Sequence, residues 1–195
     1  MSADIERSRS QAANPSGVPF ALTDDLFDAF PTASEDMTSR PAGEAPLEFM
    51  QSLARGPIPE EAITFGAYLL PRRKAVWWGH ECLRTLTQLL TEQDLRMMML
   101  AEHWVREPEE EQRVAALEQA MACRSKTPGV WIALAAGWTG GSMVDPPMPR
   151  LAPPPYLLPR AVNAGILSGL ARVNMSHRAT TLKHFVEMGI GLALR

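Results

Sequence analysis

The sequence predicts an all-α protein: a compact array of about seven or eight antiparallel helices, with a disordered acidic tail before them and a proline-rich loop near the C-terminal end. Three observations predict this class. Apolar residues recur at helical spacing over most of residues 46–195, prolines stand directly before many of these runs, and no segment alternates like a half-buried strand. Hydrophobic residues make up 46% of the 195 residues, which is enough for a buried core.

The N-terminal segment, residues 1–45, differs in composition from the rest of the chain. It holds eight acidic and three basic residues and is rich in Ser, Ala and Pro, which is typical of disordered segments. Within it, residues 20–30 form a short amphipathic stretch: Thr23 can cap a helix whose apolar side carries Phe27 and Phe30. Two interpretations stay open. The stretch packs on its own domain, or it folds when it docks on a partner.

Residues 46–195 are predicted to form a single helical domain. Prolines precede most of its apolar runs, and proline is favoured at the first position of a helix because its missing N–H would be unpaired there. Short connections between successive helices favour antiparallel neighbours. Helices are therefore predicted near residues 46–55, 59–69, 71–90, 93–106, 108–124, 128–139, 159–173 and 177–194.

Two adjacent tryptophans in the helix predicted at 71–90 point to opposite sides. Trp78 falls on the apolar side. The other side holds Trp77 with four charged or titratable residues, Arg73, His80, Glu81 and Arg84. Trp and Arg are enriched at interface hot spots, so Arg73, Trp77 and Arg84 are candidate partner-binding residues. The alternative is that a neighbouring helix covers Trp77.

The helix predicted at 128–139 is followed by a proline-rich loop. Seven of the 17 prolines of the chain lie between Pro146 and Pro159. Prolines restrict the loop to extended shapes, which lowers the entropic cost of ordering it. We expect Trp138, Pro154 and Tyr156 to present a ridge to a partner protein. The alternative is that the loop only crosses the top of the helix bundle.

The helix predicted at 159–173 carries Ala161, Gly165 and Gly169 at a spacing of four residues. Small residues at this spacing allow another helix to approach closely. The last helix of the same chain is the favoured neighbour, and close association of two copies of the chain is the alternative. Formation of a homo-oligomer therefore stays open.

The sequence holds no constellation that indicates catalysis. It contains no Gly-x-Ser-x-Gly elbow, no phosphate-binding loop and no dinucleotide-binding fingerprint. The four histidines lack the spacing of a helical metal site. We therefore predict no catalytic residue, no cofactor and no metal site.

Charge, cysteines and hydropathy exclude several other classes. The net charge is −3 without a basic cluster, which argues against a nucleic-acid partner. The sequence contains no uninterrupted apolar stretch of about 18 residues, the length needed to cross a membrane. Its N-terminus also lacks the pattern of a secretory signal. Cys82 and Cys123 have no metal or redox spacing and are expected to be reduced thiols, which predicts a cytoplasmic protein.

Scattered aromatic, glycine and proline positions carry a family resemblance over about residues 46–195. They are Leu70-Pro71-Arg72-Arg73-x-Ala75-Val76-Trp77-Trp78, then Pro128-x-x-Trp131-x-Ala133-Leu134-Ala135-Ala136-x-Trp138-x-Gly140-Gly141-Ser142, then Pro153-Pro154-x-x-Leu157-x-x-Arg160-Ala161-Val162. This pattern resembles an uncharacterised bacterial domain of unknown function, loosely associated with type VI secretion gene neighbourhoods. The resemblance implies an accessory role, as adaptor or chaperone, toward a secretion effector, a spike component or a toxin.

The leading functional hypothesis is a non-catalytic protein–protein interaction module, an adaptor or chaperone for bacterial secretion cargo. One alternative is an enzyme or small-ligand-binding protein with a pocket under the loop at 139–158. Its candidate groups would be Arg73, His80, Glu81, Ser142 and Asp145, and an enzyme should gather two or more of them around one concavity. The other alternative is an immunity or antitoxin protein whose acidic tail caps a basic site of a toxin.

Overall fold

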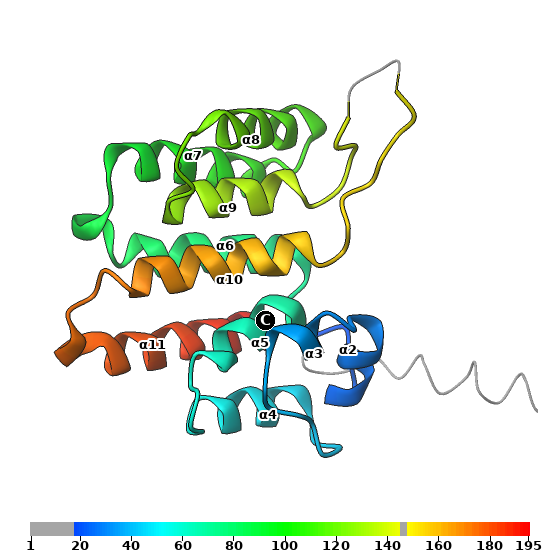
Figure 1. Ribbon diagram of the computed structural model, residues 1–195, viewed down its shortest axis with the longest axis vertical. Helices are drawn as coiled ribbons and strands as arrows, with labels where there is room; N and C mark the ends of the chain where they lie inside the picture. The colour runs from blue at the N-terminus through cyan, green and yellow to red at the C-terminus, as the bar shows by residue number, and fades with distance from the viewer. Residues whose placement is uncertain (1–17, 145–147) are drawn as a thin grey trace, which may run out of the picture.

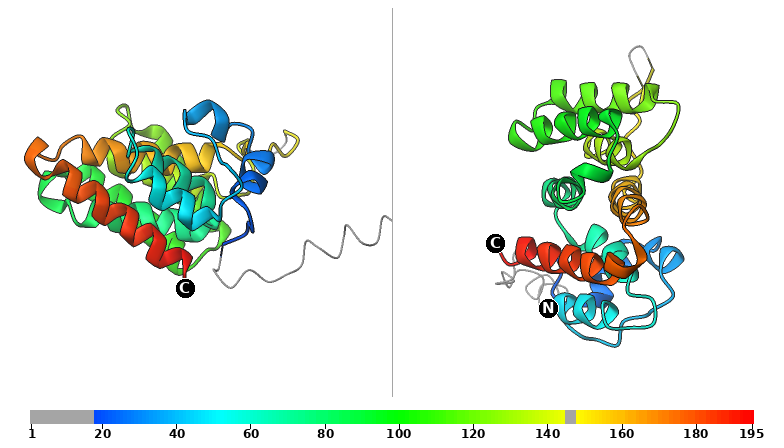
Figure 2. Two further views of the ribbon diagram at one scale, coloured as in Figure 1. Left: turned by 90° about the horizontal axis from the view of Figure 1, so that it is seen from below. Right: turned by 90° about the vertical axis from the view of Figure 1, so that its left-hand side faces the viewer.

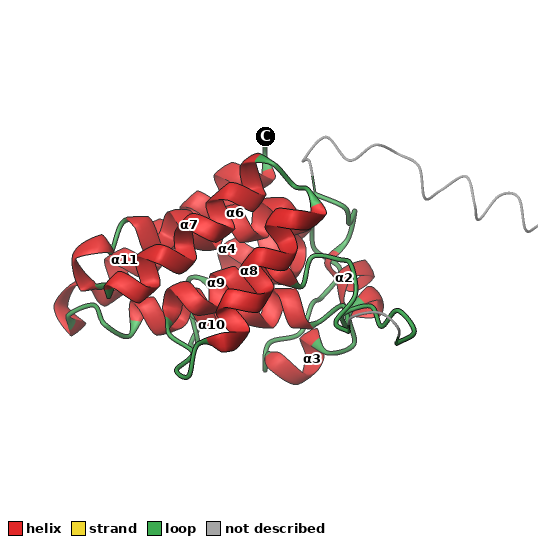
Figure 3. Ribbon diagram, turned by 90° about the horizontal axis from the view of Figure 1, so that it is seen from above, coloured by secondary structure: helices red, strands yellow, loops and turns green. Residues whose placement is uncertain are grey.

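The structure of the protein is a computed structural model that describes residues 18–144 and 148–195. Its described residues form ten α-helices and one short 3-10 helix, without a strand, so the predicted all-α class is confirmed (Figure 3). The elements are α2 (Thr23–Ala29), α3 (Ala33–Asp36), α4 (Pro46–Leu53), α5 (Glu61–Leu69), α6 (Arg72–Arg84), η2 (Thr87–Leu89), α7 (Glu92–Arg106), α8 (Glu110–Ala122), α9 (Pro128–Gly137), α10 (Leu157–Leu170) and α11 (Met175–Ala193). Asp145 and the first 17 residues of the predicted tail lie outside the described residues.

The helices stack in three tiers along the longest axis of the molecule (Figures 1 and 2). Helices α7, α8 and α9 form one end, α6 and α10 lie side by side in the middle, and α4, α5 and α11 form the other end with α2 and α3 beside them. No helix among the described residues is long and apolar enough to cross a membrane.

All helices predicted within 46–195 are present, with differences at their ends. The helix predicted at 71–90 ends at Arg84 and is followed by η2, and the side chain of Thr85 donates a hydrogen bond to the Cys82 carbonyl at this end. Helix α10 begins at Leu157, so Pro159 is its third residue and not its first. A proline in the first turn of a helix removes no internal hydrogen bond, and the sequence therefore fixes the start only to within one turn.

The segment 18–45 packs against the helical domain, whereas the sequence predicts a mostly disordered tail over residues 1–45 with one short amphipathic stretch at 20–30. Leu26 of α2 is fully buried, and the Phe27 ring stacks on the Phe65 ring at a centroid distance of 6.4 Å. Of the two interpretations for this stretch, packing on its own domain is the one observed. A few apolar side chains at helical spacing bury the segment, although its overall composition is polar.

Trp78 joins the middle tier to the lower one. Its ring is fully buried, and its indole N–H donates a 2.8 Å hydrogen bond to the Phe185 carbonyl of α11. Gly66 of α5 and Gly189 of α11 lie against the ring: a Cβ atom on either would come within 3 Å of it. The absence of a side chain at both glycines makes room for the indole.

Helix α9 is almost completely enclosed by other helices. Every residue of it except the half-buried Trp131 is buried, as is required of a helix that is apolar on all sides. Neighbouring helices approach it closely at two glycines. A Cβ atom on Gly129 would collide with the backbone of Asp94 in α7, and one on Gly137 would lie 2.7 Å from the Leu117 Cβ in α8.

Two buried charged side chains hold the two ends of α9. At its N-terminus, the Gly129 N–H donates a 2.9 Å hydrogen bond to the Asp94 carboxylate, which has no exposed surface. At its C-terminus, the Arg113 guanidinium donates a 2.6 Å hydrogen bond to the Gly137 carbonyl, and Glu110 binds the same guanidinium. Each charge has the sign that the helix dipole favours at that end.

Hydrogen bonds keep the Asp94 carboxylate ionised. Burial by itself raises the pKa of this group, but the neighbouring Thr127 hydroxyl and hydrogen bonds from Thr91 and Gly129 outweigh that effect and lower its pKa to about 2. The Arg172 guanidinium lies 3.0 Å from the same carboxylate. Asp94 therefore connects α7, the N-terminus of α9 and the turn that follows α10.

Replacing Gly129 with alanine is expected to lower the free energy of unfolding by about 1–3 kcal/mol, because the added methyl group meets backbone atoms that cannot rotate away. The matched control is Gly191→Ala, where nothing lies within 4 Å of the added atom. That variant should gain up to about 1 kcal/mol, since alanine favours helix over glycine. Urea unfolding followed by circular dichroism measures both, and equal stabilities of the two variants would contradict the packing described for α9.

Stability should depend on pH through Asp94. Its folded-state pKa of about 2 lies below the ordinary value of 3.8, so its contribution is complete above the ordinary value and is lost as the pH falls toward 2. The difference in unfolding free energy between the wild type and Asp94→Asn should therefore shrink by about 2 kcal/mol between pH 5 and pH 2. The exposed Asp28→Asn variant is the control and should follow the wild type. A difference that does not change with pH would show that the carboxylate charge is not stabilising.

Candidate functional site

The connection between α9 and α10, residues 140–156, extends away from the three tiers of helices (Figure 1). We call this segment the proline loop; its residues 145–147 lie outside the described part of the chain. Its two described limbs run out from the C-terminus of α9 and back to the N-terminus of α10. The loop therefore projects from the body of the molecule and does not lie flat across the helices.

A serine side chain ties the two limbs of the proline loop together. The Ser142 hydroxyl donates to the Val144 carbonyl at 2.8 Å and accepts a hydrogen bond from the Leu151 N–H at 3.2 Å. The Met143 N–H donates to the Leu151 carbonyl at 2.8 Å. These bonds fix the limbs side by side in the manner of a hairpin, and they give the Ser142 hydroxyl a structural role.

The limbs of the proline loop expose three large apolar side chains. Met143 is 40% exposed, Met148 58% and Leu151 55%, within a stretch of nine residues. Isolated exposed apolar residues are common on protein surfaces, whereas a local group of them marks an interaction surface. The group lies on a segment that its prolines and its hydrogen bonds restrain.

A cavity of about 280 Å³ lies under the base of the proline loop. Its wall combines rings and aliphatic side chains from α5, α9, α10, the loop and the segment after α2 with two arginines. The lining residues are Phe30, Ala67, Tyr68, Leu70, Arg72, Trp138, Thr139, Gly140, Gly141, Arg150, Ala152, Pro153, Pro155, Leu158 and Pro159. The pocket that the sequence placed under residues 139–158 is thus present as a hollow, with a lining that differs from the predicted one.

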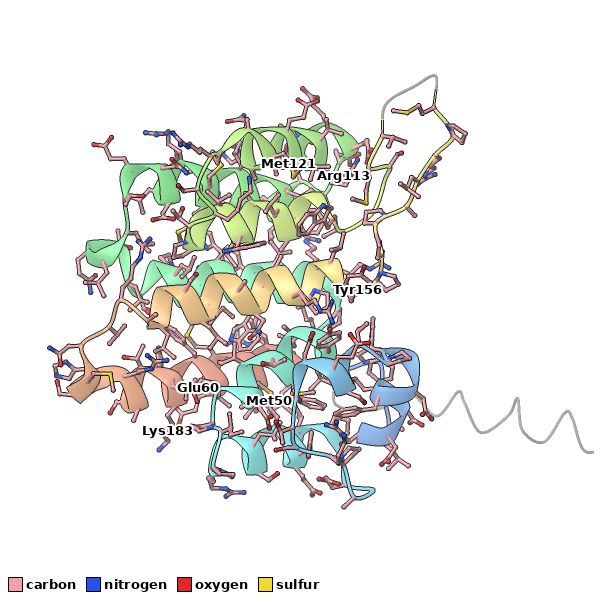
Figure 4. All side chains as sticks on the ribbon, in the orientation of Figure 1. Met50, Glu60, Arg113, Met121, Tyr156 and Lys183 are labelled. Atoms are coloured by element: carbon pink, nitrogen blue, oxygen red, sulfur yellow. The ribbon has the colours of Figure 1, made fainter. Side chains whose placement is uncertain are left out.

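Two arginines fix the backbone where the proline loop leaves α9. The Arg72 guanidinium donates a 2.7 Å hydrogen bond to the Thr139 carbonyl. The Arg113 guanidinium lies against Gly141, whose positive φ of 72° is a conformation that favours glycine (Figure 4). A side chain at position 141 would have to occupy the space of that guanidinium. Gly141 is therefore required both for the turn and for the placement of Arg113.

A polar cluster holds the other end of the loop. The Tyr68 hydroxyl donates a 2.6 Å hydrogen bond to Asp36, and the Arg160 guanidinium lies 2.9 Å from the same carboxylate and 4.7 Å from the centroid of the Tyr156 ring. Burial and the neighbouring Asp36 raise the pKa of Tyr68 to about 12, so its hydroxyl stays protonated as a donor. Asp36 fixes the Arg160 guanidinium by an ion pair, and the guanidinium in turn contacts the Tyr156 ring. The cluster therefore anchors Tyr156 at the start of α10 (Figure 4).

The predicted partner-binding residues separate into two groups. Phe30 and Trp138 line the cavity, both half-buried, and Pro154 and Tyr156 lie half-buried at the returning limb of the loop. Phe27 is also half-buried, but it packs inward against α5. The structure thus brings together four of the eight predicted residues at the base of the proline loop.

The second group lies on α6, along α7. The Trp77 ring stacks on the His80 ring at a centroid distance of 5.0 Å and is half-buried. Arg73 donates a 2.6 Å hydrogen bond to the Val105 carbonyl, and Arg84 forms an ion pair with Glu81. The Arg73 hydrogen bond joins α6 to α7, whereas the Trp77 and Arg84 contacts lie within α6. Arg73 also lines a second hollow that Gly140 and Gly141 border, but it is not among the residues that line the cavity under the loop.

His80 is buried, at 4% exposure, although it lies on the side of its helix opposite to the apolar one. Glu102 of α7 lies 3.8 Å from one ring nitrogen and Glu81 lies 3.1 Å from the other. Helix α7 covers this side of α6, so the helix is enclosed on two sides, which is the alternative that the sequence left open for Trp77. Helical spacing separates the faces of a helix but does not show how many of them are covered.

The groups proposed for an enzyme do not meet around one hollow. Arg73 lies beside α7, His80 and Glu81 pair with each other, and Ser142 closes the proline loop. Asp145 lies outside the described residues. Residues 18–144 and 148–195 also contain no cluster of three or more His, Cys, Asp or Glu side chains that could hold a metal ion.

Sequence reasoning missed several residues of this site. Met143, Met148 and Leu151 are visible in the sequence as apolar residues among prolines, and this could have identified them. Arg72 and Arg150 are 78 positions apart and meet only through the fold. Nothing in the sequence connects them with each other.

A comparison with known families identifies the family to which the chain belongs. A family model described as "Family of unknown function (DUF6931)" matches residues 49–193, and the chain belongs to this family. The match begins within α4 and covers the following helices and the proline loop. No curated protein and no solved structure matches the chain.

Removing the Ser142 hydroxyl should loosen the proline loop without unfolding the protein. The Ser142→Ala variant loses the hydrogen bonds that join the limbs, and it should be cleaved after Arg150 by trypsin faster than the wild type. Its free energy of unfolding should change by no more than about 1.5 kcal/mol. Mass spectrometry of timed digests measures the cleavage.

The control for this experiment is Ser168→Ala, which removes one hydroxyl hydrogen bond inside α10. This variant should be cleaved after Arg150 at the wild-type rate. Equal cleavage of the Ser142→Ala variant and the wild type would show that Ser142 does not restrain the loop.

Proposed function

We propose that this family member is a non-catalytic protein-binding module and that its proline loop docks on the partner protein. The observation that carries the proposal is the group of exposed apolar side chains, Met143, Met148 and Leu151, on a loop that is tied at both limbs. Binding of a partner that covers exposed apolar groups is favourable, because it removes their surface from water. Thioether side chains also adapt their shape to the surface that they meet.

The restraint of the loop supports the same proposal. A flexible segment must lose conformational freedom when it binds, and this loss reduces affinity. In this loop, prolines and the Ser142 hydrogen bonds have already limited that freedom in the unbound protein. Arg72 and Arg113 fix the point at which the loop leaves α9. Such preorganisation is characteristic of a binding surface.

The polar groups that could take part in catalysis already have partners within the protein, and this supports a non-catalytic role. The Ser142 hydroxyl is occupied by loop hydrogen bonds, His80 is stacked under Trp77, and Tyr68 donates to Asp36. A nucleophile needs a base within hydrogen-bond reach and a space for the substrate beside it. The described residues offer no such pair at the cavity under the loop.

An adaptor or chaperone role in bacterial secretion is the finer form of the proposal. It follows from the family resemblance, which implies a secretion effector, a spike component or a toxin as the partner. A cytoplasmic location is proposed with it, because both cysteines are free thiols and burial raises the pKa of the Cys82 thiol well above its ordinary value. Thiols persist in reducing compartments.

A small-ligand function is the second candidate, and the cavity under the proline loop is the observation that favours it. Its volume of about 280 Å³ is at the lower end of the range of ligand pockets, about 300–1,000 Å³. The hollow therefore suits one side chain or a small metabolite better than a large cofactor. A protein partner that inserts a single residue uses the loop and the cavity together.

The proposal is tested with the tagged protein and an extract of its native host. The double variant Met148→Ser/Leu151→Ser should lose a partner that the wild type retains, because it removes most of the exposed apolar area of the loop. We expect at least a tenfold loss of affinity, which corresponds to about 1.4 kcal/mol. The interaction is then measured by calorimetry with the purified partner.

The matched control is Met175→Ser, which removes a more exposed methionine, 77% accessible, at the start of α11. This variant should bind the partner as the wild type does. A partner bound equally by the loop variant, or the absence of any stoichiometric partner, would contradict the proposed function.

A further inference from the structure

We propose that the cavity under the proline loop binds the C-terminal residue of the partner protein, with the carboxylate held by Arg72 and Arg150 and an apolar side chain inserted between the rings. The inference rests on the proposed function, because it assumes that the ligand belongs to a protein chain. It adds the chemical identity of the group that this chain recognises.

The polar lining of the cavity consists largely of hydrogen-bond donors. Arg72 and Arg150 are the charged residues in it, and no aspartate or glutamate is among the residues that line it. This is unexpected for a chain with a net charge of −3. Neither arginine forms an ion pair within the described part of the chain. A binding site with two cationic groups and no acidic group selects an anion.

Two carboxylates beside residues of this wall already have partners of their own. Asp36 accepts hydrogen bonds from Tyr68 and Arg160, and Glu110 binds both arms of the Arg113 guanidinium. Arg113, and more weakly Arg150, lower the pKa of Glu110, but Arg150 forms no hydrogen bond with it in the described residues. The guanidinium groups of Arg72 and Arg150 each use one nitrogen in a hydrogen bond to a backbone carbonyl, of Thr139 and Gly141 respectively. Among the described residues, their remaining N–H groups have no acceptor.

Two consecutive backbone amides add to this set of donors. Gly140 and Gly141 are among the residues that line the cavity after the end of α9, and in the described residues neither backbone N–H has a hydrogen-bond partner. Unpaired backbone N–H groups at a hollow are ready to bind an anionic oxygen. Capture of a C-terminal carboxylate by backbone amides and a basic side chain is an established mode of peptide recognition.

The rest of the cavity is apolar. Phe30, Trp138 and Leu158 contribute rings and an aliphatic chain, and three prolines of the loop and of α10 complete the wall. An inorganic anion would leave these surfaces uncovered. An anion attached to an apolar side chain fills the volume of about 280 Å³ and also meets the donors at its edge. The C-terminal residue of a protein has this combination when its side chain is large and apolar.

The probe for the experiment is N-acetyl-phenylalanine, which carries a free carboxylate, compared with N-acetyl-phenylalaninamide, which has the same ring and no charge. Binding is followed by the NMR shifts of the Gly140 and Gly141 amides in the full chain. The acid should give saturable shifts and the amide should give none. Equal binding of the two probes, or no binding of either, would overturn the inference.

Arginine variants test the assignment of the donors. Arg150→Gln should weaken the binding of the acid about tenfold, the usual effect of losing one charge-assisted hydrogen bond. Arg72→Gln should weaken it similarly, with its fold checked by circular dichroism because Arg72 also binds Thr139. The control is Arg124→Gln, an exposed arginine in the turn between α8 and α9, which should leave binding unchanged. Wild-type affinity in the Arg150→Gln variant would overturn the assignment.

Peptides distinguish a chain end from a free metabolite. A hexapeptide that ends in phenylalanine with a free carboxylate should bind more tightly than N-acetyl-phenylalanine, and the same peptide with an amidated end should not bind. If the peptide binds less tightly than the single residue, the cavity serves small carboxylates and the inference fails. If the loop-dependent partner is retained by Arg150→Gln and by Arg72→Gln, the inference fails while the proposed function stands.

Discussion

The buried helix α9 is held at both ends by charged side chains, and the position of the proline loop depends on this arrangement. Asp94 binds its N-terminus and Arg113 its C-terminus, each with the sign that the helix dipole favours. The body of α9 is apolar on nearly all sides and offers no polar group that would fix its register. The charges at its ends therefore fix it along its axis. The loop begins where Arg113 holds the helix.

Glycines make this arrangement sterically possible. Gly129 and Gly137 allow α7 and α8 to approach the backbone of α9, and Gly165 of α10 leaves room for the Ile132 side chain on the other side. Three helices, α7, α8 and α10, can thus lie close to a single central one. Protein interiors are close-packed, so a helix enclosed in this way cannot shift without moving its neighbours. The base of the proline loop, which follows α9 directly, is therefore held in place as well.

The candidate site combines two features that contribute differently to binding. The exposed side chains of Met143, Met148 and Leu151 offer apolar area, which gives affinity but little selectivity. The cavity beneath them offers cationic donors among apolar walls, which distinguishes one chemical group from another. Because both lie on one restrained connection between α9 and α10, a single partner chain can contact both.

The all-α class, the approximate helices of residues 46–195 and the position of the proline loop could be predicted from the sequence alone. These follow from local rules: apolar spacing, prolines in first turns and glycines at helix ends. Three features became visible only in the folded chain: α7 buries His80, residues 18–45 pack on the domain, and Arg72 and Arg150 line one cavity. Such contacts join residues far apart in the chain. Helical spacing gives the direction of a side chain, and the neighbour that it meets depends on how the helices stack.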